Sequence, residues 1–359
     1  MTQAPLLSYI VLSYNYENYI GQTIRSILAQ TVQDFEIIVV DDASRDGSQE
    51  VVRSFNDQRI RLLINENNMG GAWSYNRAIE AARGEWLVNL DADDWIAPQK
   101  AEVQLAAVAT NPQLDVIGTY VNFVDSTGAP HPRAMEFESF LNMPHELGQV
   151  DSWIGTNSLC RSSTMVRRST HIQLGCFDPF MVSAPDYEFW TRALREDCCF
   201  LVVPQPLTFS RVHSKGVTHA DPVGKLLELT YAMLRNLVPL TEARALNPSL
   251  ERIIAWAARH PQLSDLRPIE TYRLLGMLMT SPPLDDFASF RAALSAPESD
   301  QVLINAGRRC LLLCGEGSSL SLYARKLERD IEAYIEAREY WRLRSETRKR
   351  ASFWNLIRG

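Results

Sequence analysis

The sequence lacks any apolar run of about 18 residues, the length that a membrane-spanning helix requires. It also lacks a basic start followed by an apolar stretch, so it predicts no secretory signal. Basic residues are not in excess. The formal net charge of -7 argues against a protein that binds nucleic acid, whose surface would be basic.

Patterned cysteines and glycines are missing as well. The 6 cysteines show no metal-site spacing, and Cys310 and Cys314 lie one helical turn apart in an apolar stretch, as buried thiols do. We therefore expect a protein of the reducing cytoplasm. No G-x-G-x-x-G follows the first predicted strand, which disfavours a nicotinamide dehydrogenase.

The sequence does contain ample apolar residues in a regular alternation. At 359 residues and 46% hydrophobic content, it can form two globular domains. The first hundred residues alternate predicted strands and helices: Leu7–Leu12, Ile20–Gln30, Phe35–Val40, Ser48–Phe55, Ile60–Asn65, Gly71–Ala82 and Trp86–Leu90. This order predicts an α/β fold with a doubly wound, mixed but mostly parallel sheet.

The pattern changes twice further along the chain. Between Ala101 and Asp221 it is looser, with expected elements at Ala101–Thr110, Val116–Val124, Thr164–Arg168, Pro185–Glu196 and Cys199–Val203. Beyond residue 222 it is almost wholly helical, at Lys225–Leu237, Leu250–Arg259, Glu270–Met279, Phe287–Leu294, Gln301–Leu313 and Leu320–Arg344. We therefore expect one domain over residues 1–222 and a helical domain over 223–359.

A basic and apolar tail closes the sequence. Arg342 to Arg350 is rich in basic residues, and Phe353, Trp354, Leu356 and Ile357 follow. Such a segment can lie on an anionic membrane surface, which would make the protein peripheral there. A solvated tail or a helix that contacts a partner, including a second copy in a homodimer, is the alternative.

Polar clusters follow three of the predicted strands: Ser13–Asn15, Asp41-Asp42 and Asp91–Asp94. The carboxyl ends of parallel strands meet at one edge, where ligands bind. Carboxylates directly after an apolar strand repel one another unless a cation offsets their charge. Mg²⁺ and Mn²⁺ take oxygen ligands and keep positions open for phosphates, so this edge predicts a metal–diphosphate site.

A nucleotide can be placed at the same edge. Asp42 is able to accept a hydrogen bond from N3–H of uracil or thymine, Tyr14 can stack on the base, and Asp41 is structural or faces the ribose. The alternative is that Asp41 and Asp42 form a turn with Ser44 and cap the next helix.

The segment from Ser8 to Pro98 resembles the family 2 glycosyltransferases, which have the A-type nucleotide-sugar fold. The matching motifs occur in the family's order: Ile10–Asn15, Ser26–Thr31, Phe35–Ser44, Asp46–Ser48, Asn67–Asn76, Gly84–Trp86 and Asp91–Asp94. The resemblance implies nucleotide-binding roles for Ser13, Tyr14, Asn15, Asp42 and Asp91. It implies Asp93 as main ligand of Mn²⁺ or Mg²⁺, with Asp91, Asp94 and His213 in the metal shell.

A second similarity lies at Leu174–Asp178 and Pro185–Trp190. In the family this region supplies the general base, which falls on Asp186, with Glu188 as fallback. The base takes the acceptor's proton in a single in-line, inverting displacement. Pro185 stands where the family has an acidic residue, and a helix cap is the alternative role of Asp186.

Weaker assignments surround this centre. Arg211 and His213 resemble the family's arginine-x-histidine element and are candidates for diphosphate or metal contact, or for a structural role. Trp153, Thr156 and Asn157 are candidate sugar or acceptor residues, although loop packing explains them equally well.

The resemblance implies a metal-dependent hexosyltransferase. No Q-x-x-R-W sequence follows Asp186, which argues against a processive polysaccharide synthase and favours a non-processive enzyme. The expected donor is a UDP- or dTDP-linked sugar, and the acceptor a glycan or a lipid-linked sugar. Two alternatives stay open: a catalytically inactive nucleotide-sugar-binding or scaffold protein, and a nucleotidyltransferase. Ser13 to Glu17 stands where nucleotidyltransferases usually carry a glycine-rich basic loop.

Overall fold

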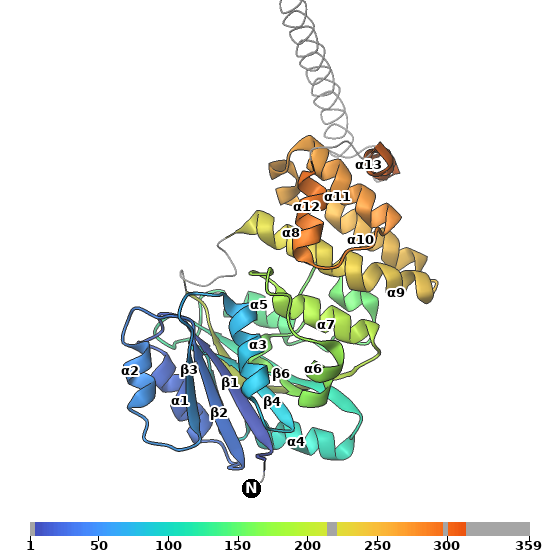
Figure 1. The fold of residues 1–359 in the computed structure, drawn as a ribbon. Coiled ribbons are helices and arrows are strands. Elements are labelled where there is room, and N and C mark those ends of the chain that lie inside the picture. Colours follow the sequence, from blue (N-terminus) through green and yellow to red (C-terminus); the bar gives the residue numbers. More distant parts are fainter. Residues whose placement is uncertain (1–3, 214–220, 297–300, 314–359) are drawn as a thin grey trace, which may run out of the picture. The chain divides into compact units, whose positions relative to one another are not determined.

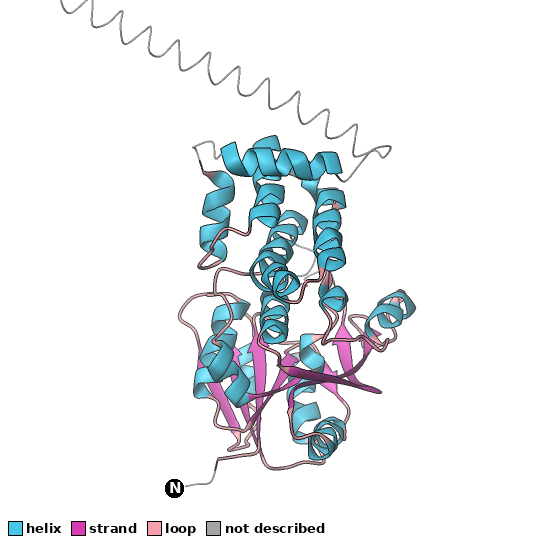
Figure 2. Cartoon of the chain, turned by 90° about the vertical axis from the view of Figure 1, so that its right-hand side faces the viewer, coloured by secondary structure: helices cyan, strands magenta, loops and turns pink. Residues whose placement is uncertain are grey.

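The computed structural model describes residues 4–213, 221–296 and 301–313. An eight-stranded sheet has the order β3-β2-β1-β4-β7-β6-β8-β5. Its strands are β1 (Leu7–Ser13), β2 (Phe35–Asp41), β3 (Ile60–Ile64), β4 (Trp86–Asp91), β5 (Trp95–Ile96), β6 (Leu114–Val124), β7 (Met165–Arg167) and β8 (Cys199–Arg211). Helices cover both faces of the sheet (Figures 1 and 2).

The four strands expected from the first hundred residues form the parallel half of the sheet. β1 pairs in parallel with β2 and β4, and β2 with β3. The helices between them are α1 (Ile20–Leu28), α2 (Ser48–Arg53) and α3 (Gly71–Ala81). The predicted fold class is therefore confirmed.

Burial explains why these elements could be read from the sequence. Every residue of β2 is buried, because helices lie on both faces of the parallel strands and require apolar side chains on each. Ile20, Ile24 and Ile27 of α1 share one helical face and are fully buried in the sheet core.

The other half of the sheet is mixed. β7 is antiparallel to β4 and β6, β8 is parallel to β6, and β5 is antiparallel to β8. The predicted end of a strand at Val203 is wrong, since β8 continues to Arg211. Pro206 pairs with Tyr120 at an irregularity of the ladder, where proline is tolerated.

Helices of this half include α4 (Lys100–Thr110), α6 (Arg168–Leu174) and α7 (Pro185–Arg195). α5 (Ala134–Leu141) was not predicted, and none of its residues is buried. Short 3₁₀ helices lie at η1 (Val150–Trp153) and η2 (Arg161–Ser163).

The later helices are α8 (Pro222–Ala232), the π-helix η4 (Met233–Leu237), α9 (Val238–Ala243), α10 (Asn247–Arg259), the 3₁₀ helix η5 (Pro261–Asp265), α11 (Pro268–Thr280), α12 (Phe287–Ser295) and α13 (Gln301–Leu313). The chain separates into two compact units. One comprises residues 1–253 with 284–290, and the other 254–283 with 291–359. The functional division at residue 222 remains a prediction. In the described part of the chain, no helix has the length and apolarity needed to cross a bilayer.

The predicted helix Leu320–Arg344 and the basic tail lie outside the described residues.

Candidate functional site

The predicted polar clusters meet at the carboxyl ends of β1, β2 and β4. Ser13 is in register with Asp41, and Leu12 is in register with Asp91. The N–H of Asp42 donates to the carbonyl of Ser13 at 2.8 Å. The three strand ends therefore form one rim, as the strand order predicted.

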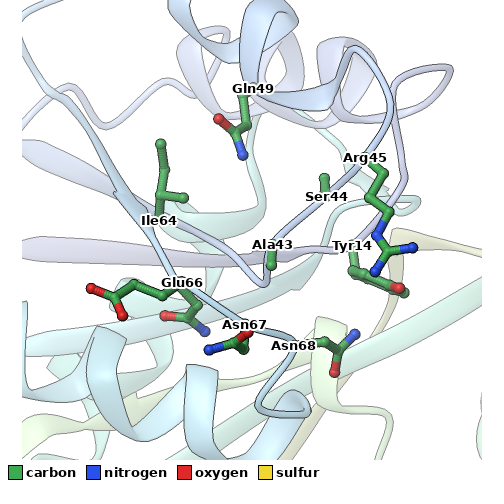
Figure 3. A pocket seen from close by; sticks show the side chains of 10 residues that line it. Tyr14, Ala43, Ser44, Arg45, Gln49, Ile64, Glu66, Asn67 and Asn68 are labelled. Atoms are coloured by element: carbon green, nitrogen blue, oxygen red, sulfur yellow. The ribbon is translucent and has the colours of Figure 1, made fainter.

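A polar cavity of about 360 Å³ opens beside this rim. Tyr14, which is 42% exposed, lines it together with residues from the loops after β2 and β3. Figure 3 shows Ser44, Arg45 and Gln49 across the cavity from the Glu66–Asn68 segment. The aromatic ring can stack on a planar base, and the amide side chains beside it can hydrogen-bond to the edge of that base.

The carboxylate of Asp42 is already engaged within the protein. It accepts hydrogen bonds from Asn65 Nδ2 at 2.7 Å and from the N–H groups of Met69 and Gly70, both at 2.8 Å. Gly70 has φ of 88°, a left-handed conformation that suits glycine and directs its N–H toward Asp42 as α3 begins. Asp42 therefore holds the β3–α3 loop in place.

The other residues of the rim brace its two loops. Asn15, at φ 59°, accepts from Arg45 N through Oδ1, while its own N–H donates to Ser44 Oγ. Asp41 Oδ1 accepts from Ser44 N at 3.0 Å and from Gln49 Nε2 at 2.8 Å. Within the described structure Asp41 Oδ2 and Ser13 Oγ are buried and have no hydrogen-bond partner.

The acidic turn after β4 joins the end of β8. His213 Nε2 lies 2.9 Å from Asp93 Oδ2, although 120 residues separate them in sequence. Asp94 Oδ1 accepts from the N–H of Arg211 at 2.7 Å. Tyr19 stacks on the His213 ring at 5.7 Å and an interplanar angle of 22°. The structure therefore brings the predicted ligands Asp93 and His213 into direct contact.

Burial and mutual repulsion dominate the electrostatics of this turn. Partial burial raises the pKa of Asp91, and the Asp93 charge raises it further, against the effect of Arg161. Burial also raises the pKa of Asp94 well above its ordinary value, as do Asp93 and Asp91. The pKa of Tyr16 is raised by burial and by the same three carboxylates. A cation bound here would relieve this repulsion.

The donor set fits a hard divalent cation shared with a substrate. Among the described residues, no group of three or more His, Cys, Asp or Glu side chains is arranged to hold a metal by itself. Asp93 and His213 can supply two ligands, and Asp91 lies two residues from Asp93. Mg²⁺ and Mn²⁺ sites in phosphate enzymes commonly take the remaining oxygens from phosphate and water.

Arg211 is engaged within the protein. Its guanidinium donates to the carbonyl oxygens of Asp93, Asp125 and Ser126 and to Gln22 Oε1, at 2.9 to 3.0 Å. It also lies 4.5 Å from the ring centroid of Tyr19. In this structure Arg211 holds the acidic turn against β8, and only one of its five N–H groups is left for a diphosphate.

Arg161 belongs to the site and was missed. It comes from η2, forms an ion pair with Asp91, and lies 5.9 Å from the ring centroid of Tyr75. Burial lowers its pKa, but the charges of Asp91 and Asp186 outweigh this effect and raise it. The guanidinium therefore interacts electrostatically with both the donor-side acid and the predicted base.

Asp186 occupies the first turn of α7 and accepts a hydrogen bond from Asn157 Nδ2 at 2.8 Å. The structure thus brings together the predicted base and a predicted acceptor residue. Glu188 lies elsewhere: it is 1% exposed and paired with Arg192 at 2.9 Å. Its carboxylate is unavailable to an acceptor, which favours Asp186.

Trp153 packs in the interior. It is fully buried, and its indole N–H donates to the carbonyl of Leu147 at 2.8 Å. Loop packing therefore accounts for Trp153, and sugar stacking does not. Thr156 is half-buried in the same loop, two residues from the buried Ser158.

Residues 8–175 match the model of "Glycosyl transferase family 2". The putative teichuronic acid biosynthesis glycosyltransferase TuaG of Bacillus subtilis is 40% identical over 195 residues, 54% of this chain and 73% of the relative. The UDP-Glc:alpha-D-GlcNAc-diphosphoundecaprenol beta-1,3-glucosyltransferase WfgD of Escherichia coli is 40% identical over 116 residues, 32% of this chain and 46% of the relative.

Two solved structures share the fold. The 1–349 segment of S. aureus TarS, in complex with UDP-GlcNAc, has a TM-score of 0.58 at 19% identity, covering 94% of this chain and 91% of its own. The mannosyltransferase PcManGT from Pyrobaculum calidifontis, in complex with GDP-Man and Mn²⁺, has a TM-score of 0.53 at 18% identity, covering 93% of this chain and 87% of its own.

Proposed function

Because this chain belongs to glycosyl transferase family 2, we propose that it is an inverting, metal-dependent and non-processive hexosyltransferase. It moves one sugar from a nucleoside diphosphate to an acceptor hydroxyl in polysaccharide biosynthesis. The observation that supports this best is the contact between Asp93 and His213 at 2.9 Å on the same rim as Asp91. Two potential metal ligands from distant segments meet there beside a polar cavity.

Separate residues bind the base, hold the metal and fix the acidic turn. Tyr14 and the cavity receive the base, while Asp42 keeps the β3–α3 loop in the shape that forms the cavity wall. Asp93 and His213, with Asp91 close by, would hold a divalent cation, which would supply Lewis acidity toward the departing diphosphate. Asp94 stays bound to Arg211 N and fixes the turn.

Asp186 takes the proton of the acceptor hydroxyl as its oxygen attacks the anomeric carbon and the bond to the diphosphate breaks. Asn157 orients the carboxylate by donating to Oδ2. Arg161, next to Asp91, balances negative charge as it develops on the leaving diphosphate. A single displacement of this kind inverts the anomeric configuration.

The substrate class follows from chemistry and from relatives. A uridine or thymidine donor fits a base site lined by amides. The WfgD name contains UDP-Glc, and the TarS structure is a complex with UDP-GlcNAc. The WfgD name also contains a diphosphoundecaprenol acceptor, so a lipid-linked sugar is the acceptor that we propose. We place the reaction at the cytoplasmic face of the membrane.

The test is a donor panel of UDP-glucose, UDP-galactose, UDP-GlcNAc, dTDP-rhamnose and GDP-mannose, each with Mn²⁺ and with chelator. Donor hydrolysis or transfer should require Mn²⁺, and NMR of the product should show inverted configuration. Retention of configuration, or turnover that ignores the chelator, would overturn the proposal. Any variant tested in this panel is compared with Glu242→Gln, an exposed change on α9.

A further inference from the structure

Glu228 lies on α8, beyond the segment that matches the family model, and it is buried at 3% exposure. Its carboxylate faces the loop before α7. Oε1 accepts from the N–H of Val182 at 2.8 Å, and Oε2 accepts from those of Ser183 and Ala184 at 2.8 and 2.7 Å. A buried acid that receives three consecutive backbone amides fixes that backbone closely.

These amides are the entry to the helix that carries the base. Ala184 is the N-cap residue of α7 and provides no side-chain cap. Val182 and Ser183 lie in the loop before the helix, whereas the N–H of Ala184 belongs to the helix start, whose N–H groups have no partner within the helix and need an outside acceptor. Burial raises the pKa of Glu228, while the three N–H groups act in the opposite direction. Hydrogen bonds to a carboxylate are about twice as strong as those between neutral groups.

The π-helix η4 holds α7 at a second point. Asn236 Nδ2 donates to the Glu188 carbonyl at 3.2 Å and to Thr191 Oγ1 at 3.1 Å. It is fully buried. A π-helical turn is rare and is often found at functional sites. Here that turn includes Asn236.

The same segment also contacts the loop that carries Asn157. The N–H of Gly155 donates to Met233 Sδ at 3.2 Å. Met233 is the first residue of η4. α8 and η4 therefore contact both the helix of Asp186 and the loop of its hydrogen-bond partner.

We propose that Glu228 is a positioning residue for Asp186: by holding the amides of residues 182–184, it fixes the first turn of α7 and the place of the base. The inference rests on the proposed function, in which Asp186 is the base. Proton transfer needs a heavy-atom distance of about 2.6 to 3.2 Å. A displacement of about 1 Å costs on the order of 100-fold in rate. α8 and η4 are thus part of the acceptor half of the site.

The experiment compares Glu228→Gln with the wild type. Glutamine keeps the volume but has one acceptor oxygen in place of two, so at least one N–H faces an amide N–H₂. We expect kcat to fall about 10- to 100-fold, with the acceptor KM and the Kd for UDP with Mn²⁺ within about three-fold of wild type. Glu242→Gln should leave all three unchanged.

Amide hydrogen exchange gives a readout that does not depend on turnover. In Glu228→Gln the amides of Val182, Ser183 and Ala184 should exchange faster, while those of β1 keep their protection. Faster exchange with wild-type kcat would overturn the positioning role, and so would a loss of UDP binding equal to the loss of kcat. If Glu228→Gln gives no folded protein, Glu228→Asp is used: it keeps the charge and shortens the reach, and wild-type kcat would again refute the role.

The proposed function is tested separately by Asp186→Asn. Full turnover in that variant would remove the base assignment itself. A dead Asp186→Asn beside a fully active Glu228→Gln would reject only the role of Glu228.

Discussion

Replacing Arg161 with methionine should tighten Mn²⁺ binding to the free protein and yet slow transfer. Arg161 is paired with Asp91, and its side chain is 19% exposed. The Arg161 charge repels a cation bound beside Asp91. Two unit charges at about 5 Å interact by roughly 3 kcal/mol at an effective dielectric constant of 20. Because the Asp91 side chain is 36% exposed, water and salt screen the interaction. We expect about 1 kcal/mol, or roughly five-fold tighter Mn²⁺ binding.

The effect on turnover has the opposite sign. With nucleotide bound, the variant lacks a cation beside the leaving diphosphate, and loss of one such group costs about 100-fold in kcat. A merely structural role for Arg161 would weaken metal binding and turnover together. The opposed signs therefore separate an electrostatic role from loss of folding.

Mn²⁺ titration without nucleotide, followed by the EPR signal of free Mn²⁺, measures the first effect. Arg244→Met removes an ion pair with Asp197, whose side chain is 82% exposed, and is the control. Unchanged or weaker Mn²⁺ affinity in Arg161→Met would refute the reasoning. So would an unchanged kcat.

Three further predictions concern stability, each read as the free energy of unfolding in urea. Burial, with a contribution from Arg192, lowers the pKa of His171 to about 3, so between pH 7.5 and 5 only the unfolded chain takes up its proton. The unfolding free energy of His171→Phe minus that of wild type should therefore rise by about 2 kcal/mol from pH 7.5 to pH 5. A constant difference would contradict this. Burial lowers the pKa of Lys100 to about 7, so Lys100→Met should stabilise the protein by about 2 kcal/mol at pH 8. This gain should shrink toward pH 10, where the unfolded chain also loses the lysine proton. A gain that does not shrink would count against the prediction. A Cβ at Gly276 would lie 2.1 Å from the Leu303 carbonyl oxygen, so Gly276→Ala should destabilise the protein by about 3 kcal/mol. A Cβ at Gly148 has nothing within 4 Å, so Gly148→Ala should change stability by no more than about 0.5 kcal/mol. Equal costs would refute the packing argument.

The parallel half of the sheet could be predicted because its strands are buried on both faces. β2 reads as a continuous apolar run, and α1 repeats isoleucine at helical spacing. α5 gave no such signal, since none of its residues is buried. β8 extends beyond its predicted end at Val203, because the ladder is irregular at Pro206 and continues.

The rim of the site was predictable for a related reason: residues that directly follow parallel strands share one edge. Ser13, Asp42 and Asp91 follow this rule. Arg161 did not, because it lies on a short 3₁₀ turn and its partner is 70 residues earlier in the chain.

Glu228 had one sequence signal, a single acid within the apolar stretch Leu226–Leu229. Its partners are backbone amides more than 40 residues away, which no spacing rule connects. Long-range contacts of this kind become visible only in the folded structure.

The most direct test of the account compares Asp93→Asn with Asp186→Asn. UDP-sugar binding with Mn²⁺ is measured by calorimetry, and transfer to a lipid-linked sugar is measured beside it. Asp93→Asn should lose Mn²⁺-dependent binding. Asp186→Asn should bind within about three-fold of wild type and lose transfer by 1,000-fold or more, at the upper range for a general base. Transfer by Asp186→Asn within about ten-fold of wild type, or Mn²⁺-dependent binding retained in Asp93→Asn, would contradict the assignment of base and metal site.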